Sequence, residues 1–123
     1  MTSVDPLFAR ANLVRSQAIG NRTADPLPRL LAQLLARAGA PAVIERATSR
    51  PWASALFEGR RHVVRLTLGG DDAAARGALF AQGLAEAEWT LPHHFVADIV
   101  IDDQGEHVDS VWIEMSALTI RDW

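Results

Sequence analysis

The hydrophobic pattern of this chain changes its period near Pro41, and that change decides which fold class is open to it. In residues 25–39 the apolar side chains recur every three to four positions, and Asp25 and Pro26 stand where a helix would start. In residues 61–68 the side chains instead alternate between two faces, as they do in a half-buried strand. A chain that passes from helical to strand periodicity in this way predicts an α+β domain.

The same signals predict the remaining elements. Asp5 and Pro6 begin an earlier helical stripe, so we interpret residues 1–24 as an N-terminal helical arm and residues 25–123 as a single α+β domain. A further helix is expected at residues 73–84. Strands are expected at residues 42–48, 52–57, 61–68, 86–91, 95–101 and 107–120, with turns at Glu58-Gly59 and at residues 102–105.

These elements predict an antiparallel sheet of four to five strands with one long helix packed on one face. One or two N-terminal helices precede this unit. A ferredoxin-like fold, or a related α/β-sandwich, is the architecture that this arrangement favours.

Charge and composition exclude several partners. The net charge is −3 and no basic cluster is longer than Arg60-Arg61, so we expect neither nucleic acid nor an anionic membrane surface as a partner. The chain has no cysteine, which excludes disulfides, thiolate metal sites and a cysteine nucleophile.

The N-terminal residues and the amino-acid usage suggest the cellular location and the kind of source of the protein. Residues 1–5 carry no basic segment, and Arg10 and Arg15 interrupt any apolar run, so a signal peptide is not expected and the predicted location is the cytoplasm. All 12 basic residues are arginine and alanine is abundant, as is typical of a GC-rich bacterial genome.

Parity along the strands predicts which side chains the helix leaves uncovered. The expected core consists of Val64, Leu66, Leu68, Phe95, Ala97, Ile99, Val111, Ile113 and Met115. The opposite face would carry Arg61, Val63, Arg65, His94, Val96, Asp98, Trp112, Glu114 and Ser116. An ordinary solvated face is more uniformly polar than this mixture of apolar and charged groups.

Two functions compete for that face. The first is a non-catalytic accessory or interaction protein that forms a homodimer through it, with charges paired across strands or across the dimer. The second is a small-ligand-binding protein or enzyme with a pocket on the same face, built from Arg65, His94, Asp98, Trp112 and Glu114. A third, weaker hypothesis is that the helix at residues 6–19 docks on a larger partner.

No signature of a metal, cofactor or nucleophile site accompanies these residues. The four histidines, at positions 62, 93, 94 and 107, match no metal-binding spacing, and no serine lies in a G-x-S-x-G turn. Gly69-Gly70 precedes two aspartates that would repel a phosphate. We therefore expect no metal and no cofactor, and the catalytic residues, if the chain is an enzyme, stay unassigned.

Overall fold

Helix and hairpin alternate twice along the part of the chain that the computed structural model describes, residues 25–122. The elements are α2 (Leu27–Ala38), β2 (Ala42–Ala53), β3 (Glu58–Gly69), α3 (Ala73–Ala81), a short 3-10 helix (Leu84–Glu86), β4 (His94–His107) and β5 (Ser110–Arg121). The helix expected before residue 20 lies outside the described residues. Neither α2 nor α3 is long and apolar enough to cross a membrane.

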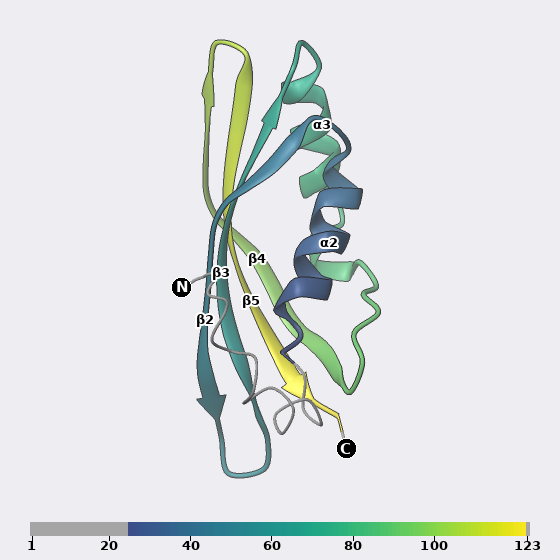
Figure 1. Ribbon diagram of the computed structural model, residues 1–123, viewed down its shortest axis with the longest axis vertical. Coiled ribbons are helices and arrows are strands. Elements are labelled where there is room, and N and C mark those ends of the chain that lie inside the picture. Colours follow the sequence, from purple (N-terminus) through teal and green to yellow (C-terminus); the bar gives the residue numbers. More distant parts are fainter. Residues whose placement is uncertain (1–24, 123) are drawn as a thin grey trace, which may run out of the picture.

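The four strands form one antiparallel sheet in the order β2-β3-β5-β4. Each hairpin therefore contributes one central strand and one edge strand. Figure 1 shows α2 and α3 along the same face of the sheet, with the tips of the two hairpins at opposite ends. The prediction of an α+β fold with an antiparallel sheet is confirmed. A ferredoxin-like chain runs β-α-β-β-α-β, which the observed order does not match, so that finer architecture is not confirmed.

Helix α2 has the bounds that its apolar stripe predicts. The Asp25 carboxylate accepts a hydrogen bond of 2.9 Å from the backbone N–H of Leu27, which satisfies one of the unpaired donors at the helix start. Leu30 and Leu34 are fully buried against the sheet. The single long helix expected at residues 73–84 is shorter, because α3 ends at Ala81 and a 3-10 turn follows.

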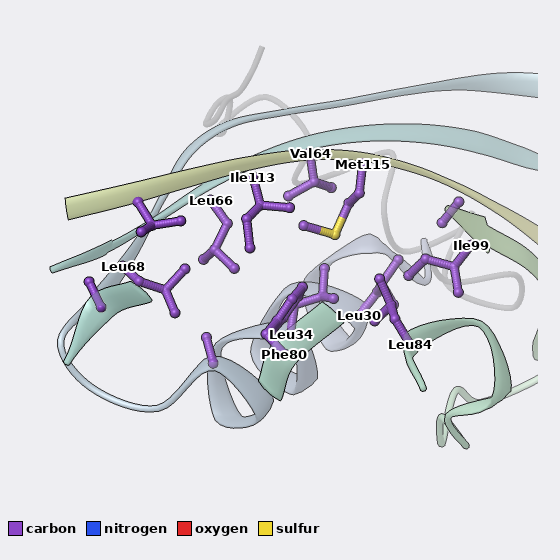
Figure 2. Packing of buried hydrophobic residues seen from close by; sticks show 14 of the residues in the cluster. Leu30, Leu34, Val64, Leu66, Leu68, Phe80, Leu84, Ile99, Ile113 and Met115 are labelled. Carbon is purple, nitrogen blue, oxygen red and sulfur yellow. The ribbon is translucent and has the colours of Figure 1, made fainter. Parts of the chain in front are cut away.

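The core lies between the sheet and these two helices (Figure 2). Seven of the expected core residues are buried there: Val64, Leu66, Leu68, Ile99, Val111, Ile113 and Met115. The prediction is wrong for Phe95 and Ala97, which are exposed. The pairing of β4 with β5 shifts between Val96 and Asp98, and such a bulge reverses the faces to which the residues on either side point.

Strand β2 is continuous through the proline at which the sequence suggests a break. Pro51 lies opposite Arg60 on β3, and no strand of residues 25–122 pairs with the other side of β2. An edge strand tolerates the missing N–H of proline because that group can face away from the ladder. The hairpin turn consequently falls at residues 54–57, and not at Glu58-Gly59, which belong to β3.

Two other segments differ from expectation. Residues 87–91 form no strand. The backbone of Thr90 pairs with a side chain: the amide of Gln33 donates to the Thr90 carbonyl at 2.8 Å and accepts from the Thr90 N–H at 2.9 Å. The expected turn at residues 102–105 lies inside β4, where the register shifts between Ile101 and Asp103. The turn itself is at residues 108–109.

Arginine side chains tie the helical layer to the sheet. The Arg76 guanidinium on α3 donates to three backbone carbonyls. They belong to Ala38 at the end of α2, to Pro41 just before β2 and to Gly69 at the end of β3. Its Nε also lies 3.1 Å from the carboxylate of Asp72. One side chain thus satisfies carbonyl groups from three separate segments.

Candidate functional site

The face of the sheet opposite α2 and α3, called the open face below, is organised in rows across the strands. Residues directly opposite each other on paired strands point to the same face. The register therefore places four rows there, each in the order β2, β3, β5, β4. The tryptophan row is Val43, Thr67, Trp112, Gly105; the first charged row is Arg46, Arg65, Glu114, Asp103; the small row is Thr48, Val63, Ser116, Val100; the second charged row is Arg50, Arg61, Leu118, Asp98.

Trp112 lies between the backbone of a neighbouring strand and a guanidinium group. A Cβ added to Gly105 on β4 would lie 2.6 Å from the indole nitrogen, so only glycine leaves room for the ring. The guanidinium carbon of Arg65 is 4.1 Å from the ring centroid, which is a cation–π contact. The ring is therefore held against the sheet with its outer side covered by Arg65.

Three polar contacts cross the face beside this stack. Arg46 pairs with Glu114 at 2.7 Å, reaching from β2 past β3 to β5. Arg65 pairs with Glu45 at 3.3 Å, and Glu45 occupies the register shift in β2. The Ser116 hydroxyl donates to the carboxylate of Asp102. These contacts join the strands, but several charged side chains of the face pair with no other described residue.

The charges on the open face are separated by sign. The β2–β3 half carries Arg46, Arg50, Arg61, Arg65 and one acid, Glu45. The β5–β4 half carries four carboxylates, Asp98, Asp102, Asp103 and Glu114. In the four rows just defined, the β5–β4 half has no arginine.

Like charges consequently stand directly opposite each other on paired strands. Arg50 faces Arg61, Arg46 faces Arg65, and Asp103 faces Glu114. Such cross-strand pairs are destabilising by themselves. Within residues 25–122, Arg50, Arg61 and Asp98 have no ion-pair partner.

The structure brings together only part of the site that the sequence suggests. Arg65, Trp112 and Glu114 lie in neighbouring rows, and Asp98 is two rows away from Glu114. His94 is not on the open face. It pairs with Arg121 beyond the bulge in β4, and its ring Nδ1 lies 2.9 Å from the carbonyl of Pro92.

Val96, the next residue but one, shows the same reversal of faces. It pairs with the buried Thr119 and packs against the core, although the sequence places it on the open face. His94 instead borders an open hollow of about 550 Å³ near the start of α2, which Arg60, Glu58 and Asp25 also line.

Sequence reasoning missed what β2 contributes to the open face. The alternation of Arg46, Thr48 and Arg50 was the available signal, since every second residue points to the same side of a strand. The expected break at Pro51 concealed it. The interpretation also assigned no role to Glu45, which reaches the face because of the register shift beside it.

A buried histidine lies on the other side of the sheet. His62 is fully buried, and its Nε2 is 2.9 Å from the hydroxyl of Thr119, which donates to the carbonyl of Arg60. With that hydroxyl proton engaged, the histidine Nε2–H donates to Thr119, and Nδ1 is a lone pair that accepts no hydrogen bond from the described residues. The pKa of His62 is lowered to about 4, chiefly by burial; the carboxylate of Asp25 opposes this shift, and the charges of Arg60 and His94 add to it.

Nothing in the described residues gathers three metal-ligating side chains. Among residues 25–122, no such group of histidine, aspartate or glutamate could hold a metal ion. A scan against protein-family models and searches of curated proteins and of solved structures return no match. The open face, with its separated charges, is the feature of the described chain that most resembles a binding surface.

Proposed function

We propose that this chain is a non-catalytic accessory or interaction protein that forms a homodimer through its open face. The separation of charge across that face carries the proposal. Arg50 and Arg61 stand side by side on one half, and Asp98 stands in the same row on the other half. A second copy offers these three side chains the opposite charges with which the described strands of their own copy do not pair them.

The area of the face fits a stable dimer. Strands β2, β3 and β5 have 12 residues each, which corresponds to a length of about 40 Å, and four strands span about 19 Å. The face therefore offers about 750 Å² per copy, close to the roughly 800 Å² that each partner buries in a standard interface.

Apolar side chains on the face favour burial as well. Val43, Val63 and Val100 are 55%, 36% and 42% exposed and come from three different strands. Trp112 adds a half-buried aromatic ring at one end of the face. Interfaces commonly combine such aromatic and aliphatic groups with arginine and a charged rim.

The geometry gives less support to a ligand pocket on this face. The guanidinium of Arg65 is already stacked on Trp112, and His94 lies beyond the bulge in β4. The two hollows described lie at the ends of the molecule. None of the four residues Arg65, Trp112, Glu114 and Asp98 lines either of them. The hypothesis that residues 6–19 dock on a partner concerns residues outside those described.

A bulky charge in the middle of the face tests the proposal. We expect Val63→Arg and, on the edge strand, Thr48→Arg to convert a dimer into a monomer, because both side chains lie in the small row where the two sheets would meet. Leu79→Arg is the matched control, since Leu79 is 67% exposed on α3 in the opposite layer.

The measurement is sedimentation velocity, with circular dichroism to confirm that each variant is folded. Thr48 lies on an exposed edge position, so its replacement leaves the core intact even where Val63→Arg unfolds the chain. A wild-type chain that sediments as a monomer would refute the proposal. Variants in both positions that dimerise as well as the wild type would refute it too.

A further inference from the structure

We infer that the two copies are related by a two-fold axis that runs parallel to the strands, between β3 and β5, so that the basic half of each copy covers the acidic half of the other. This inference rests on the proposed dimer and specifies its partner geometry. The basic half is the β2–β3 hairpin and the acidic half is the β4–β5 hairpin.

Two simple arrangements place one open face on another. An axis parallel to the strands turns the sheet over sideways, so that β2 lies over β4 of the partner and β3 lies over β5 of the partner. An axis in the interface plane but perpendicular to the strands turns the sheet over end to end, so that β2 lies over β2. Both are isologous, and the sequence of strands β2-β3-β5-β4 makes them chemically different.

The charges favour the parallel axis. With this axis each row stays at its own level, so Arg46 and Arg65 lie over the carboxylates of the first charged row in the partner. In the second charged row, Arg50 lies over the partner's Asp98, and the neighbouring Arg61 lies over the partner's Leu118. The perpendicular axis would bring arginines onto arginines and carboxylates onto carboxylates, which is unfavourable across an interface.

The small row lets the two sheets approach in this arrangement. It lies between the two charged rows and contains no charged residue. The parallel axis places Thr48 over the partner's Val100 and Val63 over the partner's Ser116. Side chains of this size suit two sheets packed about 10 Å apart, and aligned sheet packing keeps the strand directions within about 30° of each other.

Engineered cysteines distinguish the two axes, because the natural chain contains none. In the parallel arrangement Thr48→Cys lies opposite Val100→Cys of the other copy. Two copies of Thr48→Cys are offset by three strand spacings, about 14 Å, in addition to the separation of the sheets. We therefore expect a short bismaleimide to crosslink a mixture of the two single variants and to leave each variant alone uncrosslinked.

The possible outcomes separate this inference from the proposed dimer. Dimers in which Thr48→Cys crosslinks to itself, or in which the mixture does not crosslink, would overturn the parallel axis while the dimer stands. Monomers by sedimentation would remove the dimer itself. A mixture of Leu79→Cys with Val100→Cys, which places one thiol on the helical layer, is the control for random collision.

Charge reversal in the second charged row gives an independent test, since Arg50 and Asp98 have no ion-pair partner within the described chain. For the parallel axis, Arg50→Asp or Asp98→Arg alone should raise the dissociation constant about tenfold, and mixing the two variants should restore it. Strengthened association of Arg50→Asp alone would contradict the parallel axis, because the perpendicular axis places Arg50 near arginine.

Discussion

At the scale of single residues, His62 gives the described chain its clearest dependence on pH. Its pKa of about 4 in the folded protein lies below the ordinary value of 6.5, because burial disfavours the charged ring. The unfolded chain therefore binds the proton more tightly. The contribution of neutral His62 to the free energy of unfolding is complete above pH 6.5 and is lost as the pH falls from about 6.5 to about 4. Its full size is about 3 kcal/mol.

Urea unfolding at pH 7.0, 5.5 and 4.5, at one protein concentration, measures this effect. The matched variant is His62→Gln, whose side-chain amide can donate to Thr119 as Nε2 does but does not titrate. We expect the free energy of unfolding to fall more steeply with acid in the wild type than in the variant. Equal pH dependence in both proteins would contradict the assignment.

Single residues also show where sequence reasoning reaches its limit. Gly105 follows Asp102 and Asp103 in a pattern typical of a turn, yet it lies inside β4, where it pairs with Trp112 and leaves room for the indole ring. The sequence reveals a glycine but not the side chain from another strand that requires it.

At the scale of elements, Arg76 holds the two layers together. Its guanidinium donates to three backbone carbonyls from separate segments and is mostly buried. Arg76→Ala should lower the free energy of unfolding by about 2–4 kcal/mol, because carbonyls that are partly buried lose charge-assisted partners. Arg76→Lys should recover only part of this loss, since an ammonium group cannot reproduce the planar fork.

Urea unfolding checks this prediction, with Arg29→Ala on the exposed side of α2 as the control. The control should change stability by less than about 0.5 kcal/mol. A similar small change for Arg76→Ala would show that its contacts do not support the fold.

The identity of several elements could be predicted from the sequence, but the others, and the details of all, could not. The apolar stripe from Leu27 to Ala38 and the alternation of residues 61–68 appear as a helix and a strand. The bulge between Val96 and Asp98 could not be predicted, because one extra residue reverses the faces without changing the local composition. That bulge explains why Asp98 reaches the open face and His94 does not.

At the scale of the whole molecule, the candidate site is a property of the sheet register. Parity alone indicated that Arg65, Trp112 and Glu114 share a face, and the structure agrees. The separation of charge emerges only when β2 and β4 take their places at opposite edges, which depends on the strand order β2-β3-β5-β4. Local sequence patterns do not show which strand of each hairpin lies at the centre of the sheet and which lies at its edge.

Sedimentation equilibrium of the full, unmodified chain tests the central claim most directly. The chain has a mass of 13.4 kDa, and we predict a species of twice that mass that dissociates at higher salt, because part of the association comes from paired charges. A single species at the monomer mass throughout the micromolar range, at low as well as high salt, would contradict the claim that the open face binds a second copy.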